Sequence, residues 1–414
     1  TLPNKVVGRY AYDRASRITG ITYSRTVRKK TYTVGSVSYE YDRVGNRKYV
    51  GGMSSDTDYD YDDLSRLTEV REGPNQSTTY TYDAVGNWTK IINVERKFKK
   101  WGSEVSAVYN DGNQMVQSGG QVLTYDANGN LLFDGAKTYT WDARNRLIGI
   151  TSSGRLTASF SYDALGRRVS KTINGSKTEY LYDGNDIVAE INGGVVSTTY
   201  LRGLNIDEPF VRRQSSGWSE YFLADALGST LELTNDNGIV TTRYSYDPFG
   251  KTMAIGSGII SSNPFQYTGR ENDGTGLYYY RARYYSPKLQ RFISEDPINY
   301  TQLRLWDQLA PEGIAEVTQL ILYLQGYPEL LNLYPYVTNN PLRYNDPYGL
   351  IGWDTVAKQI IKKIGGKIGK SLDDDTLITD KEEQDLLNKE EEYRKLREDR
   401  PPCVTVGGRK PHAC

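Results

Sequence analysis

A short pattern of alternating aromatic and polar residues recurs along most of the chain. It has the form Tyr-x-Tyr-Asp in segments such as YEYDRVGNR (39–47), YDYDDLSRL (59–67), YTYDAVGNW (80–88) and FSYDALGRR (160–168). Alternation with a period of two places both aromatic residues on one face of a strand. The aspartate is suited to begin a turn, and the glycine that often follows tolerates a positive φ. Each segment therefore predicts a β-hairpin.

The hairpins recur at a nearly fixed distance. Asp42, Asp62 and Asp83 are separated by 20 and 21 residues, and the same spacings follow Asp142. Such a period indicates stacked supersecondary units. Because one hairpin cannot bury its own face, we predict an all-β fold in which a long sheet curls or closes. A motif repeated this often is scaffold, so each Tyr-Asp pair is interpreted as turn and packing.

Composition narrows the classes of function. The chain has 35 Tyr against 8 Phe, which suits strands, and it carries 51 Lys+Arg and 51 Asp+Glu. A net charge of zero argues against nucleic-acid binding by the body of the protein. The two cysteines, Cys403 and Cys414, lie at the C-terminal end, so neither a disulfide nor a thiolate metal site is expected in the body. The start, TLPNKVVGRY, lacks Met and any leader pattern, and we expect a piece of a longer or processed chain.

Two segments depart from the strand pattern. Apolar residues at helical spacing near 300–330 predict an inserted helical hairpin, and the tail 351–414 is predicted to be mostly helical. The Lys-rich part of the tail is either a surface helix or a membrane-touching one. His412 with Cys403 and Cys414 offers three zinc ligands where about four are needed, or a Cys-His nucleophilic pair. Residues so near a chain end are poorly fixed, and we predict no cofactor and no metal.

Three later segments carry a resemblance to a known family. They are YFLADALGSTLELTNDNG (221–238), FQYTGRENDGTGLYYYRARYYSPKLQRFISEDPI (265–298) and LYPYVTNNPLRYNDPYGL (333–350). In this order they resemble the core of Rhs proteins, whose YD repeat is shared with teneurins and the C subunits of insecticidal toxin complexes. The resemblance implies a YD-repeat β-shell (1–220), a core ending in DPYGL (221–350) and a variable C-terminal segment (351–414).

The resemblance also implies a function. The shell of a bacterial, secreted or surface-located polymorphic toxin would enclose its own C-terminal segment, with secretion machinery and an immunity protein as further partners. The family's aspartyl autoprotease would cut the Leu350–Ile351 bond once, using Asp296 and Asp346 with Arg283 as the assisting charge. Two carboxylates that share a proton supply one acid and one base at moderate pH.

Alternatives stay open on the residues themselves. Asp-Pro-x-Gly is good turn chemistry without catalysis, and a third copy at 247–250 is interpreted only as a turn. Arg281 and Arg291 could take the place of Arg283. The family's Gly-Leu after the first Asp-Pro-Ile is absent here, and the two aspartates are 50 residues apart. A non-catalytic scaffold for adhesion or recognition is therefore a second hypothesis, and a tail that is itself a toxin enzyme, such as a nuclease, is a third.

Overall fold

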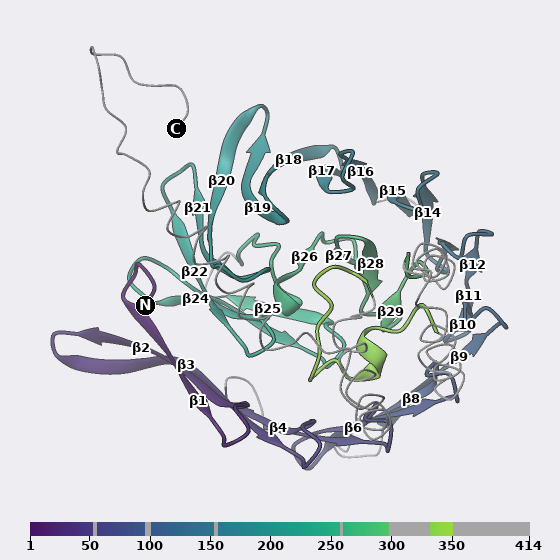
Figure 1. Cartoon of the computed structure of the whole chain (residues 1–414), viewed down its shortest axis with the longest axis horizontal. Helices are drawn as coiled ribbons and strands as arrows, with labels where there is room; N and C mark the ends of the chain where they lie inside the picture. The colour runs from purple at the N-terminus through teal and green to yellow at the C-terminus, as the bar shows by residue number, and fades with distance from the viewer. Residues whose placement is uncertain (53–55, 96–100, 153–155, 257–259, 298–331, 351–414) are drawn as a thin grey trace, which may run out of the picture. The chain divides into compact units, whose positions relative to one another are not determined.

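The computed structural model describes residues 1–52, 56–95, 101–152, 156–256, 260–297 and 332–350 (Figure 1). Contacts divide the chain into two units, 1–352 and 353–414, and the second unit lies outside the described residues. The helical predictions for 300–330 and for the tail also fall outside them. In the part of the chain that is described, no helix is long and apolar enough to cross a membrane.

The described residues of the first unit are all-β, as predicted. The first sheet contains β1 (Val6–Tyr12), β2 (Ile18–Val27), β3 (Lys30–Tyr41), β4 (Arg47–Gly52), β5 (Thr57–Tyr61), β6 (Leu67–Glu72), β7 (Gln76–Tyr82), β8 (Trp88–Glu95), β9 (Trp101–Tyr109), β10 (Met115–Ser118) and β11 (Gln121–Val122). The second contains β12 (Thr124–Tyr125), β13 (Leu131–Phe133), β14 (Lys137–Trp141), β15 (Leu147–Ser152), β16 (Thr157–Tyr162), β17 (Arg168–Ile173), β18 (Ser176–Asp183), β19 (Asp186–Asn192), β20 (Val195–Arg202), β21 (Pro209–Gln214), β22 (Ser219–Ala224), β23 (Thr230–Thr234), β24 (Val240–Tyr246) and β25 (Thr252–Gly256).

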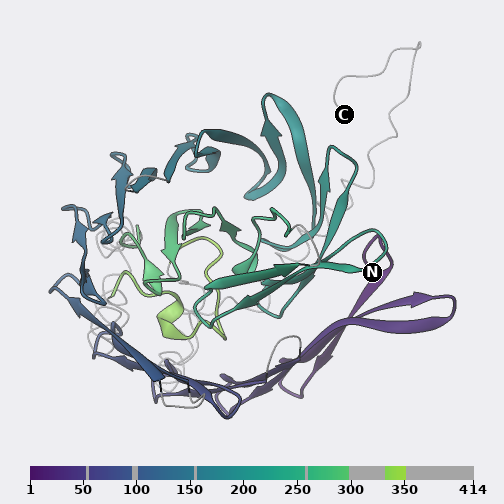
Figure 2. The same ribbon diagram turned by 180° about the vertical axis from the view of Figure 1, so that it is seen from behind.

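A small third sheet lies inside the curve of the other two. It contains β26 (Glu271–Asn272), β27 (Tyr278–Tyr280), β28 (Arg283–Ser286) and β29 (Arg291–Phe292), and the 3-10 turns Tyr267–Gly269 and Val337–Asn339 lie outside its strands. Strand order in all three sheets follows the chain, and every pairing is antiparallel. Figures 1 and 2 show the long sheets bending around β26–β29. The predicted division at residue 220 falls within β22, and the second sheet continues across it.

The aspartate of most repeats forms the turn that the sequence predicts, whereas Asp183 remains in β18 and pairs with Asp186. In the β5–β6 hairpin, Oδ1 of Asp62 accepts the backbone N–H of Leu64 at 3.1 Å and of Arg66 at 2.8 Å. The residue three positions after the aspartate has a positive φ, which is 95° at Gly45 and 64° at Ser65. The carboxylate thus satisfies the backbone where the strand ladder ends.

Neighbouring repeats are joined through the end of each turn. Arg66 donates to the backbone oxygen of Asp83 at 2.9 Å, and its guanidinium lies 4.9 Å from the ring centroid of Tyr82. The hydroxyl of Tyr82 donates to the carbonyl of Leu67 at 2.8 Å. The second tyrosine of one repeat therefore contacts both the arginine and the backbone of the preceding repeat, which explains its high frequency.

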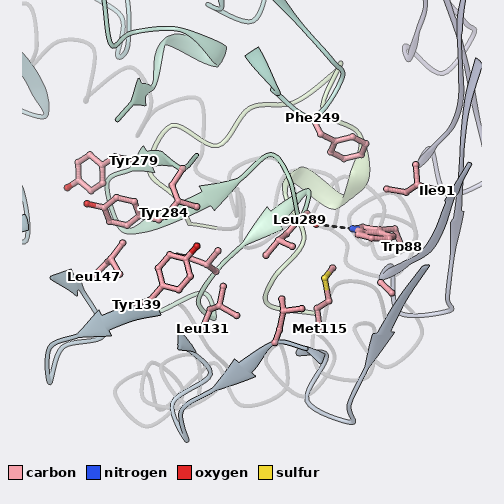
Figure 3. Close-up of a cluster of buried hydrophobic side chains, with 14 of the residues drawn as sticks. Trp88, Ile91, Met115, Leu131, Tyr139, Leu147, Phe249, Tyr279, Tyr284 and Leu289 are labelled. Carbon is pink, nitrogen blue, oxygen red and sulfur yellow. Dashed lines mark hydrogen bonds between the residues drawn. The ribbon is translucent and has the colours of Figure 1, made fainter. Parts of the chain in front are cut away.

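The first tyrosine of the motif packs inward. Tyr39, Tyr59 and Tyr80 are buried, whereas the residue after each is exposed. Tyr59 and Tyr80 share an apolar cluster with residues of 277–293, where Trp88 Nε1 donates to the carbonyl of Leu289 at 2.9 Å (Figure 3). Tyr39 belongs to a different cluster, with Leu223 of the second sheet. The concave face of the long sheets thus packs in several apolar clusters.

The contact between neighbouring repeats can be tested by replacing two arginines of one turn. Arg146 pairs with Asp142, donates to the backbone of Asp163 and stacks on Tyr162, whereas the side chain of Arg144 is exposed without a polar contact in the described residues. We expect Arg146→Ala to lower the free energy of unfolding by roughly 1–2 kcal/mol. Arg144→Ala should change it by less than about 0.5 kcal/mol. Urea unfolding of both variants measures this, and equal losses would contradict it.

Candidate functional site

The predicted site is built around a buried arginine at the start of β28. Arg283 follows the two-residue connection from β27, and its side chain is 1% exposed. Its Nη2 lies 2.7 Å from Oδ2 of Asp296 and 3.3 Å from Oδ2 of Asp346. Its guanidinium also stacks on Phe292, 3.6 Å from the ring centroid. The structure therefore brings the three predicted residues together around one nitrogen.

The remaining donors of Arg283 bind backbone oxygens. Nε donates to the carbonyl of Gly349 at 2.5 Å, and Nη1 donates to the carbonyl of Leu333 at 2.9 Å. A guanidinium has no acceptor and five donors, so a buried one must find several oxygens. Here these oxygens belong to both aspartates and to the segment 333–349 that contains the second of them.

The two ends of the long stretch between the aspartates lie close together. The backbone N–H of Asp296 donates to the carbonyl of Leu333 at 3.2 Å. That carbonyl is the one that also accepts from Arg283. The separation of 50 positions between Asp296 and Asp346 in the sequence therefore does not keep the carboxylates apart in space. This agrees with the slow growth of loop-closure cost with length.

Burial sets the protonation of the second carboxyl. Desolvation raises the pKa of Asp346 to about 6, against the opposing effects of Arg283 and of the Leu350 N–H, and the charge of Asp296 raises it further. Burial lowers the pKa of Arg283, and both carboxylates oppose that shift. A neutral and a charged carboxyl can thus coexist beside one cation near pH 6.

The DPYGL segment ends the described chain at Leu350, and Ile351 lies outside the described residues. The backbone N–H of Leu350 donates to Oδ1 of Asp346 at 3.0 Å. Gly349 has φ 66°, and a Cβ there would lie 2.1 Å from the carbonyl oxygen of Tyr280. Only glycine allows this close approach, so the neighbouring Tyr280 carbonyl requires glycine as the fourth residue of the motif.

The other candidates lie elsewhere. Arg291 donates to the carbonyl of Asn113 at 2.7 Å and stacks on Tyr334. The 247–250 copy forms the turn between β24 and β25, where Asp247 accepts from the Lys251 N–H at 2.8 Å. Arg281 contacts the motif, at the carbonyl of Pro347, but neither carboxylate of the pair in the contacts described. His412, Cys403 and Cys414 lie outside the described residues.

Sequence reasoning missed the backbone contacts. The carbonyl of Leu333 accepts a hydrogen bond from Arg283. Ala282 donates its N–H to the carbonyl of Tyr348 at 3.1 Å. A backbone group leaves no residue-type signal. The Arg-Ala-Arg spacing gives no signal either, because residues 281 and 282 form the turn between β27 and β28 and the two arginines bind different carbonyls.

Gly349→Ala tests the fit of the motif. The added Cβ must move away from Tyr280, so we expect faster amide hydrogen exchange in residues 345–350, measured by mass spectrometry. Gly274→Ala is the matched control, since Gly274 has a similar φ of 70° and nothing within 4 Å of the added Cβ. Unchanged exchange at 345–350 in Gly349→Ala would contradict the described fit.

Comparison with known proteins identifies the family of the chain. The model of the teneurin YD-shell family matches residues 9–342. The chain is 31% identical over 301 residues to the tRNA3(Ser)-specific nuclease WapA of Bacillus spizizenii, covering 71% of this chain and 12% of that protein. It is 26% identical over 442 residues to toxin subunit YenC2 of Yersinia entomophaga, covering 85% and 41%.

A solved structure supports the fold. The crystal structure of TcdB2-TccC3-TEV superposes with a TM-score of 0.65 at 23% identity, covering 84% of this chain and 18% of that chain. The chain therefore spans only a small part of WapA and of this complex. The family model covers more than half of the residues, and the chain belongs to the teneurin YD-shell family, with Rhs and toxin-complex proteins among its relatives.

Proposed function

We propose that this chain is part of a bacterial Rhs-type shell that encloses its own C-terminal segment and releases it by cutting the Leu350–Ile351 bond. One observation carries the proposal: Arg283 contacts Asp296, Asp346 and the carbonyl of Gly349, one residue before that bond. Buried Arg270 also pairs with two carboxylates, those of Asp207 and Glu271, so the distinguishing feature of Arg283 is its contact with the segment just before the bond. A buried cation that joins two carboxyls to a backbone segment fits a protease site.

The proposed roles of Asp296 and Asp346 in cutting the bond follow from their different surroundings. Asp296, the closer partner of Arg283, accepts a proton from a water molecule, whose oxygen attacks the carbonyl carbon of Leu350. Asp346 in its neutral form donates to the carbonyl oxygen as charge develops there. The tetrahedral intermediate then breaks its C–N bond, the nitrogen of Ile351 takes up the proton that Asp296 accepted from water, and Asp346 recovers its proton from the intermediate. The products are a carboxylate at Leu350 and a free amine at Ile351, formed once per chain.

The relatives suggest what the shell is for. They include proteins named as a tRNA nuclease, a toxin subunit and the toxin protein Tse5 of Pseudomonas aeruginosa, which is 25% identical to this chain. We infer a secreted or surface-located toxin whose partners are residues 351–414, a secretion apparatus and an immunity protein. The activity of that segment is left unassigned. Nucleic-acid binding is not assigned to the shell.

A non-catalytic scaffold is the second candidate. The sequence after Asp296 lacks the Gly-Leu of the family. One relative is named salivary gland surface protein 1, from Aedes aegypti, at 25% identity over 61% of this chain. In that case the contacts of Arg283 would only fasten the DPYGL segment to the core.

Intact mass on a freshly purified chain separates the two. We expect a product ending at Leu350 in the wild type, and no product in Asp296→Asn or Asp346→Asn, because each removes one partner of the acid–base pair. Asp247→Asn is the control, an aspartate before proline in a turn without described contact to the pair. A wild type that stays whole, or variants that still cut, would favour the scaffold.

The pH dependence follows from Asp346. Its carboxyl faces Arg283, Asp296 and Tyr336, and the pKa of about 6 means that the neutral acid is lost as pH rises above 6. The cutting rate should then fall by about tenfold per pH unit. Chains refolded from denaturant at pH 5 to 8 and followed by mass measure this rate. Asp247→Asn should keep the profile although the pKa of Asp247 is also raised to about 6, and a rate that increases with pH would contradict the assignment.

A further inference from the structure

Three consecutive residues hold three consecutive carbonyls of the DPYGL segment. The side chain of Arg281 donates to the carbonyl of Pro347, the backbone N–H of Ala282 to that of Tyr348, and the side chain of Arg283 to that of Gly349. Each pair is 66 residues apart in the sequence. The next carbonyl along the chain is that of Leu350, the one to be attacked in the proposed reaction. The β27–β28 connection is therefore a cradle for the segment before the bond.

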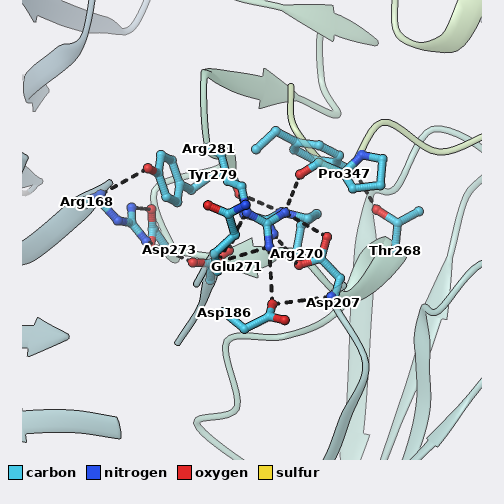
Figure 4. A network of polar contacts seen from close by, with 12 residues as sticks. Arg168, Asp186, Asp207, Thr268, Arg270, Glu271, Asp273, Tyr279, Arg281 and Pro347 are labelled. Atoms are coloured by element: carbon cyan, nitrogen blue, oxygen red, sulfur yellow. Dashed lines mark hydrogen bonds and ion pairs between the residues drawn. The ribbon is translucent and has the colours of Figure 1, made fainter. Parts of the chain in front are cut away.

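Arg281 ties this cradle to the long sheet. Its Nη2 lies 2.7 Å from Oδ1 of Asp207, and its Nη1 lies 3.0 Å from Oδ2, a two-point contact. It also lies 3.3 Å from Asp186 at the start of β19. Asp207 stands between β20 and β21 and also pairs with buried Arg270, as Figure 4 shows. A cation held by two carboxylates presents its remaining donor in a fixed direction.

We propose that Arg281 is a positioning residue that makes self-cleavage conditional on the docking of β19–β21 against the core. The inference rests on the proposed function. Tyr348 is 46% exposed, so solvent lies on one side of the segment. The position of the Leu350 carbonyl relative to the carboxyls of Asp296 and Asp346 then depends on the cradle, which lies on the other side of the segment. Only a sheet that has brought Asp207 and Asp186 into place can orient Arg281.

The conformation of Arg281 supports a specific task. It has φ 56°, in the left-handed region that residues with a side chain rarely adopt. Such a conformation persists where surrounding contacts determine it. Here those contacts are the carboxylates of the sheet on one side and the carbonyl of Pro347 on the other. Arg281 does not face the carboxyl of Asp346, so its loss should leave the titration of that group unchanged.

The test compares cleavage rates of refolded chains. Arg281→Gln should cut roughly 10- to 100-fold more slowly, since a small misplacement of the reacting group has effects of this order. Its pH profile should keep the wild-type midpoint, and Arg281→Lys, which retains the charge and one donor nitrogen, should recover part of the rate. Asp207→Asn should slow cutting and add little when combined with Arg281→Gln.

The control is Arg202→Gln. Arg202 lies 3.9 Å from the same Asp186 but has no described contact with the DPYGL segment. If Arg281 were only structural, both glutamine variants would lower the melting temperature and the cutting rate together, and lysine would not rescue cutting beyond its effect on melting. That result would overturn the proposal, as would a wild-type rate in Arg281→Gln.

A second readout keeps this inference separate from the proposed function. In an Asp346→Asn background no self-cleavage is expected, and chymotrypsin can attack after exposed Tyr348. Adding Arg281→Gln should increase the rate of that cut several-fold, while adding Arg202→Gln should not. If the wild type never cuts itself, the proposed function fails. The cradle is then upheld by faster chymotrypsin cleavage in Arg281→Gln and rejected by equal rates.

Discussion

The structure around the DPYGL segment depends on one constraint, the burial of the Arg283 guanidinium. Removing a cation from water is costly unless its donors and its charge are both matched. Arg283 meets this with two carboxyls, which lie 50 positions apart in the sequence, and two backbone carbonyls, those of Leu333 and Gly349. If both carboxyls were ionised the site would carry an excess negative charge, and the raised pKa of Asp346 removes it near pH 6. The same balance that permits burial thus leaves Asp346 with a carboxyl that titrates near pH 6.

The return of the chain to this point has its own anchors on the sheet. Asn332 donates to Oδ1 of Asn87 at 2.7 Å, and Asn340 donates to Oδ1 of Asn46 at 2.9 Å. The hydroxyl of Tyr334 donates to the carbonyl of Gly129 at 2.8 Å. Three separate hairpins therefore fix the segment that carries Asp346. Its position is set by the sheet, which explains how an unusual interval between the aspartates is compatible with their meeting.

The repeats could be predicted because they depend on local rules. The partners of the site residues could not, because they depend on long-range contacts. Alternation and Asp-turn chemistry act within about ten residues, so the hairpins and the inward tyrosines such as Tyr59 follow from the sequence. The choice among Arg281, Arg283 and Arg291 could not follow, because it depends on which carbonyls and carboxylates lie within reach after folding. The family resemblance supplied Arg283, and the geometry gives Arg281 a different set of partners, which no spacing rule encodes.

One position of the repeat does carry long-range information. Four residues after the turn aspartate the chain has arginine or asparagine in most repeats, although Ile187 and Lys251 occupy this position after Asp183 and Asp247. Arginine, as at Arg66, is long enough to reach the backbone of the next repeat. Asparagine, as at Asn46 and Asn87, still binds its own aspartate but leaves an amide oxygen for the core segment to contact. Both asparagines also contact the next hairpin, Asn46 at Ser65 and Asn87 at Asn113, so asparagine at this position joins neighbouring hairpins and binds the segment carrying Asp346 as well. The scaffold and the candidate site are in this sense specified by the same turn.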